Sequence, residues 1–311
     1  MGAPLSIVLY AADPLDAERA AEAAFARVRA LEAVFSDYDE GSEARRLAAR
    51  APGVFPASRE LVELTALALE LSARTGGAFD VTVGPLTRLW RRAVRQGEAP
   101  DAAELSAARA AVGFGKLAAD AERGTLAFAA GGMRLDYGGI AKGYAAGEAL
   151  RVLRERGFER VLVALAGDVA CGAAPPGEEG WRVALASPAG GADTAVLVCD
   201  RAVSTSGDLA RGGEVQGAAV SHLIDPRTGE ALAARPRSAT AIARAGALAD
   251  ALASVLLLLE PEEALALAGS YPGVELLLVE LGPGGPRARS TPGFPKLVSS
   301  PDRSSPNPGL P

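Results

Sequence analysis

The spacing of apolar and polar residues predicts a chain that is mainly helical over its first third. Residues 5–10 form an apolar run typical of a strand, and residues 16–35 repeat apolar side chains at helical spacing. A second helix is predicted from Ser58, a favourable N-cap residue, to the glycine pair Gly76 and Gly77, which is typical of a helix end.

The pattern changes near residue 116 toward short alternating runs. GTLAFAA and MRLDY, within residues 116–136, predict antiparallel strands, and ERVLVALAGDVACG, GWRVALASP and TAVLVCDRAVSTSGD predict more strands downstream. ALADALASVLLLLE predicts a late helix, and GVELLLVEL a strand after it. Strands and helices that are grouped in this way indicate an α+β fold rather than regular β-α-β winding.

Glycine and proline divide the rest of the chain. Gly84-Pro85 predicts a turn before a short helix that contains Trp90. Eight of the 21 prolines lie between Pro283 and Pro311, mixed with serine, glycine and arginine. We therefore expect the chain to be mostly disordered after Gly282, with a domain over residues 1–295 and a Pro/Ser-rich tail over residues 296–311.

Composition narrows the classes of function. The 311 residues are 49% hydrophobic, which is enough for one large domain or two intimately packed lobes. The net charge is −6, with no basic run interleaved with aromatic residues, so nucleic acid is not an expected partner. Cys171 and Cys199 form no CxxC pair, and His222 is the single histidine. These counts argue against a disulfide framework and a multi-histidine zinc site, so any metal must be bound mainly by oxygen.

Two stretches bear on the location of the protein. The longest apolar run, near residues 251–259, is about half the length of a membrane-spanning helix, so no transmembrane segment is expected. The apolar stretch at the start of the chain has no lysine or arginine ahead of it, so no signal peptide is predicted.

The stretch LDYGGIAKGYA places Asp136, Gly138, Gly139 and Lys142 before a predicted helix. Glycines allow a ligand to approach the backbone, a helix N-terminus attracts anions, and a lysine adds positive charge, so a pyrophosphate cradle is one interpretation. The alternative is an ordinary strand-to-helix turn in which Asp136 caps the helix and Lys142 is solvated.

Two further motifs offer oxygen and nitrogen atoms for chemistry. Asp250 and Ser254 are four residues apart, on one helical face, and both supply the hard oxygen atoms that Mg²⁺ prefers. They are also compatible with an ordinary Ala-rich core helix. His222 precedes the turn at residues 225–229 and is the only imidazole available as a base near pH 7, although a lone histidine is often structural. STSGD, at residues 204–208, is expected to form a turn.

In their order along the chain these motifs resemble the ApbE-like FAD:protein FMN transferase family, over roughly residues 1–295. The motifs that carry the resemblance are MGA, FSDY, GGAFDVTVGPLTRLW, LDYGGIAKGYA, LAGD, STSGD, SHLIDPRTG and ADALAS. The resemblance implies an α+β fold of mixed and antiparallel sheets with packed helices, in two intimately associated lobes.

The resemblance also implies an activity. Family members are magnesium-dependent enzymes that cleave FAD, attach FMN through a phosphoester to a threonine or serine of an acceptor flavoprotein, of the electron-transport type, and release AMP. Two alternatives stay open: an FAD pyrophosphatase and a non-catalytic FAD-binding protein. The resemblance further implies a location in the cell envelope, on the periplasmic side.

Site residues follow from the resemblance, position by position. The expected Mg²⁺ ligands are the Gly139 carbonyl, Asp250 and Ser254. His222 is expected to deprotonate the acceptor hydroxyl or to steady the pyrophosphate, and Asp250 to serve catalysis as well. The positions that match family contacts to FAD are Met1, Tyr38, Ala78, Phe79, Asp80, Asp136, Lys142 and His222.

The chain also departs from the family pattern. Ser254 replaces a threonine, which keeps the hydroxyl but loses the methyl group that restricts its rotamer. Other departures remove polar or glycine positions, and we expect them to affect FAD affinity or acceptor choice. They are Ala3, Ala48, Ala164, Ala166 and Gly147.

Overall fold

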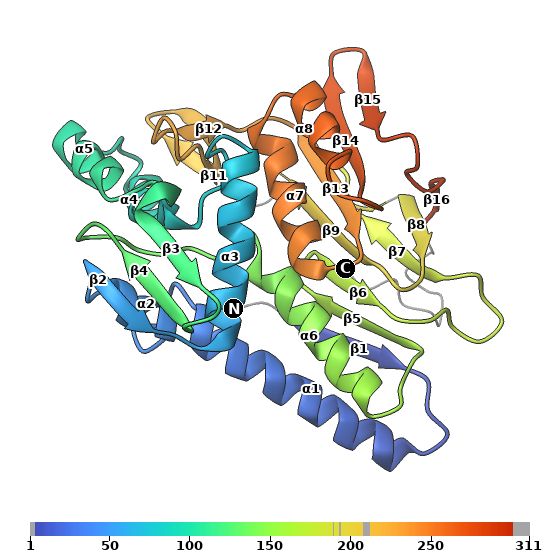
Figure 1. Cartoon of the computed structure of the whole chain (residues 1–311). Helices are drawn as coiled ribbons and strands as arrows, with labels where there is room; N and C mark the ends of the chain where they lie inside the picture. The colour runs from blue at the N-terminus through green and yellow to red at the C-terminus, as the bar shows by residue number, and fades with distance from the viewer. Residues whose placement is uncertain (1–3, 189, 193, 208–211, 301–311) are drawn as a thin grey trace. The chain divides into compact units, whose positions relative to one another are not determined.

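The computed structural model describes residues 4–188, 190–192, 194–207 and 212–300. The chain forms two compact units (Figure 1). Unit 1 comprises residues 1–30, 140–207 and 236–311, and unit 2 comprises residues 31–139 and 208–235. The boundary falls inside helix α1 (Pro14–Phe35) and again just before helix α6 (Ala141–Glu155).

Unit 1 is built on a seven-stranded antiparallel sheet in the order β1-β5-β6-β9-β13-β14-β15. Its strands are β1 (Leu5–Leu9), β5 (Val161–Leu165), β6 (Asp168–Cys171), β9 (Ala202–Gly207), β13 (Arg237–Ala243), β14 (Glu275–Gly282) and β15 (Gly285–Ser290). Strand β13, which lies between β9 and β14, is buried along its whole length, so the sheet is covered on both faces there.

Helices and a small sheet provide that cover. Figure 1 shows α6 and α7 (Gly246–Leu258) in front of the large sheet, with the start of one helix next to the start of the other. The small sheet contains β7 (Trp181–Leu185), β8 (Thr194–Val198) and β16 (Val298–Ser299), and its apolar residues share one core with those of the large sheet. Helix α8 (Pro261–Ala268) follows α7.

The α6–α7 contact depends on two glycines. A Cβ atom on Gly143 would lie 2.1 Å from the carbonyl oxygen of Gly246, and a Cβ atom on Gly246 would lie 2.1 Å from the carbonyl oxygen of Gly143. No side chain fits at either position, because a carbon and an oxygen in contact need about 3.3 Å. The glycines therefore allow the two helix backbones to touch at the start of each helix.

Unit 2 contains four helices, two 3-10 turns and two three-stranded antiparallel sheets among its described residues. The helices are α2 (Glu43–Ala48), α3 (Arg59–Arg74), α4 (Gly84–Gln96) and α5 (Ala102–Ala110), and the 3-10 turns are η1 (Val81–Val83) and η2 (Phe114–Lys116). One sheet contains β2 (Gly53–Pro56), β4 (Thr125–Phe128) and β3 (Leu117–Asp120). The other contains β10 (Gly213–Val215), β11 (Ala218–Ile224) and β12 (Ala231–Ala233).

The α+β fold predicted from the sequence is confirmed, and so are most of its elements. Ser58 is the N-cap of α3, and its hydroxyl accepts a hydrogen bond from the Leu61 N–H. No helix in the described ranges is both long enough and apolar enough to span a membrane.

Several local predictions are wrong. MRLDY, at residues 133–137, lies outside any strand. The Asp136 N–H donates to the Val81 carbonyl and the Arg134 side chain donates to Asp37, and no described strand pairs with the segment as a ladder. The STSG residues are part of strand β9, since β13 pairs with all four of them and β6 pairs with Ser204. Gly84 and Pro85 are the first residues of α4 rather than a turn before it.

The prediction of disorder after Gly282 is also wrong where the chain is described. Residues 285–290 form strand β15, in a hairpin with β14, and residues 298–299 form β16. Pro286 is tolerated because β15 is an edge strand. The rest of the predicted tail, residues 301–311, lies outside the described residues, and the boundary at residue 295 stays a prediction.

Candidate functional site

Unit 1 holds a buried polar group, the Lys142 cluster. It consists of three charged side chains, Lys142, Asp168 and Asp250, and the hydroxyl of Ser204. The Lys142 Nζ lies 3.1 Å from Asp168 Oδ2 and 3.1 Å from Asp250 Oδ1. The Ser204 hydroxyl donates to Asp168 Oδ1 at 2.5 Å. One ammonium group therefore joins two carboxylates from different elements.

Local structure explains how these side chains meet. Lys142 lies in the first turn of α6 and Asp250 on α7, and the close contact of these helices at Gly143 brings the two residues together. Asp250 Oδ2 accepts a hydrogen bond of 3.0 Å from the Gly143 N–H. Asp250 thus caps the N-terminus of α6, where the helix dipole favours a negative charge.

The Lys142 cluster holds two carboxylates and one ammonium group, so its charges do not cancel. Burial raises the pKa of Asp250 to about 6, and Asp168 adds to the rise, while Lys142 and the Gly143 N–H oppose it. Burial alone lowers the pKa of Lys142, but the two carboxylates raise it above its ordinary value. Lys142 is therefore charged, and with both carboxylates ionised the cluster carries a net charge of −1. A cation is the ligand that such a centre favours.

Ser254 lies one helical turn after Asp250 on α7, and both residues are buried. Among the described residues no three side chains of His, Cys, Asp or Glu gather as a metal site. A metal bound at Asp250 would therefore need hydroxyl, carbonyl, water or substrate oxygen to complete its ligands.

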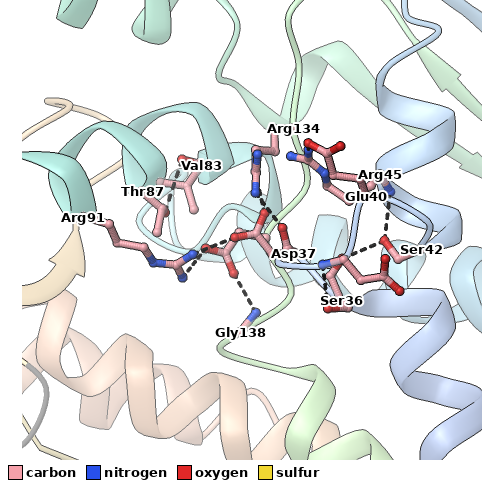
Figure 2. Close-up of polar contacts among 12 residues, drawn as sticks. Ser36, Asp37, Glu40, Ser42, Arg45, Val83, Thr87, Arg91, Arg134 and Gly138 are labelled. Carbon is pink, nitrogen blue, oxygen red and sulfur yellow. Dashed lines mark hydrogen bonds and ion pairs between the residues drawn. The ribbon is translucent and has the colours of Figure 1, made fainter. Parts of the chain in front are cut away.

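Unit 2 holds a second charged group, the Asp37 cluster, made of Asp37, Arg91, Arg134 and Asp136 (Figure 2). Asp37 Oδ2 accepts from Arg91 at 2.6 Å, and Asp37 Oδ1 accepts from Arg134 at 2.5 Å. Arg91 also donates to Asp136 Oδ2 at 3.3 Å. With two arginines and two aspartates, this cluster is neutral.

Asp136 does not cap helix α6, and Lys142 is not solvated, so the ordinary-turn interpretation is wrong at both positions. Helix α6 begins after Ile140, and Asp136 Oδ1 instead accepts a hydrogen bond of 2.8 Å from the Gly138 N–H. The Lys142 side chain is only 14% exposed. Both side chains are thus held by specific polar partners.

Tyr38 stands out as an aromatic residue on the surface of unit 2. It is 76% exposed, and the Arg91 guanidinium lies over its ring, 4.9 Å from the centroid. An exposed aromatic ring is available to stack on a flat ligand.

Ala78, Phe79 and Asp80 form a buried turn after α3. Asp80 Oδ1 accepts hydrogen bonds of 2.7 Å from both the N–H and the hydroxyl of Thr82, and so caps η1. Burial raises the pKa of Asp80, and the Thr82 bonds oppose that rise. The Asp80 side chain thus has a structural role in this fold.

His222 lies within strand β11, ahead of the turn at residues 225–229. That turn is fixed by the Arg227 side chain, which donates to Asp225 Oδ2 at 2.8 Å, and by Trp90, whose Nε1 donates to the Gly229 carbonyl at 2.8 Å. His222 lies between Val220 and Ile224, the two residues of β11 that pair with β12, where the register of the two strands shifts.

The structure therefore joins some of the predicted site residues directly and others through a third residue. Lys142 and Asp250 are in contact, and Tyr38 and Asp136 share Arg91 as a partner. Met1 lies outside the described residues, as does Ala3.

Sequence reasoning gave no role to Asp37, Arg91, Arg134, Asp168 or Ser204. Asp37, Asp168 and Ser204 lie in the motifs FSDY, LAGD and STSGD, and Arg134 lies in MRLDY, which the pattern predicts as a strand. Arg91, on α4, carries no comparable signal, because its sequence context is typical of the solvated face of a helix.

The fold and the two clusters define the class of this protein: an α+β protein of antiparallel sheets with buried ionised groups in each unit. Solved structures share this fold. The apo form of the flavinyl transferase ApbE of Pseudomonas stutzeri is 29% identical, with a TM-score of 0.78 and coverage of 93% of this chain and 95% of that one. The flavin transferase ApbE of Vibrio cholerae is 26% identical, with a TM-score of 0.80 and coverage of 94% and 95%.

The chain belongs to the ApbE family, whose profile matches residues 1–278. A protein of Klebsiella pneumoniae named FAD:protein FMN transferase is 31% identical over 68% of this chain, and the match spans 62% of that relative's length. A protein of the same name from Salmonella typhimurium is 31% identical over 80% of this chain and 75% of its own length. The family expected from the motifs is confirmed.

Proposed function

We propose that this chain is an FAD:protein FMN transferase that cleaves FAD, attaches FMN to a hydroxyl of an acceptor protein and releases AMP. The Lys142 cluster carries this proposal, because it combines a charged lysine with a net negative, buried carboxylate centre. The names of the relatives support the reaction. An FAD pyrophosphatase would use the same residues with water in place of the hydroxyl.

Mg²⁺ fits the residues of unit 1. Within the described part of the chain, Lys142 is the one cation recorded in an ion pair with Asp168 and Asp250, and burial disfavours the charge of Asp250. We propose Asp250 and Ser254 as ligands, and the Gly139 carbonyl remains a ligand on the resemblance alone. When bound, Mg²⁺ would neutralise the pyrophosphate and make its phosphorus more electrophilic.

In the proposed reaction the acceptor oxygen forms a bond to the FMN-side phosphorus of FAD. The bond from that phosphorus to the bridging oxygen breaks, and the bridging oxygen leaves with AMP. The acceptor proton passes to His222, which is the proposed base. Lys142, held charged by its carboxylate partners, stabilises the negative charge on the pyrophosphate oxygens.

We assign flavin nucleotide binding to residues of unit 2. Tyr38 offers an exposed ring for stacking, and Asp136 offers a carboxylate of fixed orientation. Ala78, Phe79 and Asp80 are buried, so their part in binding FAD would fall to the backbone of the turn. Met1 stays a prediction from the resemblance.

The acceptor we propose is a flavoprotein with a target threonine or serine, of the electron-transport type. An envelope location is expected with such a partner, and fractionation of cells that express the natural gene would check it.

AMP release from FAD is the measurement that tests the function. The assay contains FAD and Mg²⁺, with and without an acceptor peptide bearing a threonine, and compares the wild type with Asp250→Asn. Asp120→Asn is the matched control, because Asp120 lies on β3 and pairs with Arg123 at the surface. We expect acceptor-dependent AMP release from the wild type and the control, and a loss of at least about 100-fold in Asp250→Asn.

Two other outcomes of this assay would favour the alternative functions. AMP release without acceptor, and no flavin on the peptide, would favour the pyrophosphatase. FAD binding without AMP release under any condition would favour a non-catalytic binding protein and would refute the transferase proposal.

A further inference from the structure

We propose that Arg91 is a positioning residue for flavin nucleotide binding, one that fixes Tyr38 and Asp136 together. The inference rests on the proposed function, and it adds a residue that no motif marked. Its basis is the set of contacts that the Arg91 guanidinium makes in unit 2, and Figure 2 shows Arg91 beside Asp37.

Arg91 contacts three groups from two separate segments. It lies on α4 and donates to Asp37 Oδ2 at 2.6 Å and to Asp136 Oδ2 at 3.3 Å, while its guanidinium lies over the Tyr38 ring. The planar guanidinium can serve both carboxylates and an aromatic face, which the point charge of a lysine cannot do. Arg91 therefore connects the FSDY segment to the LDYGG segment.

The contact with Tyr38 orients an exposed ring. Arg91 lies over one face of this ring, whose 76% exposure leaves surface for a flat ligand on the other face. An exposed tyrosine without such a partner would sample several rotamers, and a ligand that stacked on it would have to order it. Arg91 lowers that entropic cost by holding the ring in advance.

The contact with Asp136 fixes a carboxylate at both oxygens. Oδ1 accepts from the Gly138 N–H at 2.8 Å, and Oδ2 accepts from Arg91. Without Arg91 the Asp136 carboxylate keeps its bond to Gly138 and loses the positive charge of the guanidinium. The expected consequence is a weaker site rather than an unfolded unit.

Arg134 is the reason why the loss of Arg91 should weaken the site without unfolding unit 2. It donates to Asp37 Oδ1 and to the Asp37 carbonyl, each at 2.5 Å, so the buried Asp37 keeps a cationic partner when Arg91 is removed. The Arg91 side chain is itself 35% exposed, and its removal opens no sealed cavity. Arg91→Met should therefore fold.

The test measures the affinity of the full chain for FAD by calorimetric titration. Mg²⁺ is left out so that FAD is not cleaved. Arg91→Met should bind FAD about tenfold more weakly than the wild type, and Arg91→Lys should fall in between. Arg95→Met is the control, because Arg95 is exposed one turn further along α4, and its affinity should stay within about twofold of the wild type. In the transfer assay, Arg91→Met should raise KM for FAD by about the same factor and change kcat by less than about threefold.

A double mutant separates positioning from a general structural effect. If Arg91 acts in part through Tyr38, Arg91→Met should weaken FAD binding by less than about threefold in a Tyr38→Ala background. Equal weakening in both backgrounds would overturn the part of the proposal that concerns Tyr38.

The inference and the proposed function fail in different ways. A wild-type chain that does not bind FAD overturns both. A wild-type chain that binds FAD, with Arg91→Met and Arg91→Lys binding it equally well, overturns the role of Arg91 and leaves the proposed function standing. If Arg91→Met has a lowered melting temperature, the FAD affinity of Arg91→Lys becomes the deciding measurement. An affinity equal to that of the wild type would then refute the role of Arg91.

Discussion

Two glycines of helix α6, one turn apart, should respond in opposite ways to the same substitution by alanine. A Cβ atom on Gly143 would lie 2.1 Å from the Gly246 carbonyl oxygen and 2.7 Å from Asp250 Cβ. A Cβ atom on Gly147 would have its nearest neighbour, the Gly246 nitrogen, at 3.9 Å. The first position has no room for a methyl group, and the second has enough.

The magnitudes follow from these distances. Gly143→Ala forces α6 and α7 apart by roughly 1 Å, which costs about 1–3 kcal/mol in packing, and it weakens the Gly143–Asp250 hydrogen bond, which costs about 1.5 kcal/mol more. Alanine gains about 1 kcal/mol of helix propensity over glycine at either position. The net expectation is a loss of about 1.5–3.5 kcal/mol for Gly143→Ala and a gain of up to about 1 kcal/mol for Gly147→Ala.

Thermal unfolding followed by circular dichroism measures the difference. At about 2 °C per kcal/mol for a chain of this size, Gly143→Ala should melt about 3–7 °C below the wild type and Gly147→Ala up to about 2 °C above it. Gly143→Ala should also lose FMN transfer, because Asp250 moves away from Lys142. Equal melting temperatures for the two variants would refute the argument from the helix contact.

Three further predictions concern single positions. Gly147→Asp should melt about 2 °C higher than Gly147→Ala, because its carboxylate can reach the N-terminus of α7 at Gly246, and an unchanged midpoint would contradict this capping. Ala166→Gly should stabilise unit 1 by up to about 1 kcal/mol in urea unfolding, because Ala166 has a left-handed φ of 56°, and a loss of stability would contradict the strain. His222→Ala should reduce FMN transfer by about 100-fold with little change in FAD affinity, and an effect below about twofold would rule out a base.

The local features of this chain were determined by its sequence. Ser58 caps a helix because its hydroxyl accepts a hydrogen bond from an N–H only three residues away, and Asp250 and Ser254 share a helix face because they are one turn apart. The order of the motifs was enough to identify the family. Such inferences succeed because they depend on neighbours in the chain, which a pattern of residues records directly.

Only the tertiary structure decided which charged residues meet. Lys142 pairs with Asp250 across 108 positions, and Arg91 pairs with Asp37 across 54. No periodicity records such distances, since they depend on how sheets and helices pack and, at α6 and α7, on two glycines that have no side chain. For the same reason the MRLDY segment reads as a strand and is not one: whether a strand forms depends on a partner strand, and here its residues bond to side chains from elsewhere in unit 2.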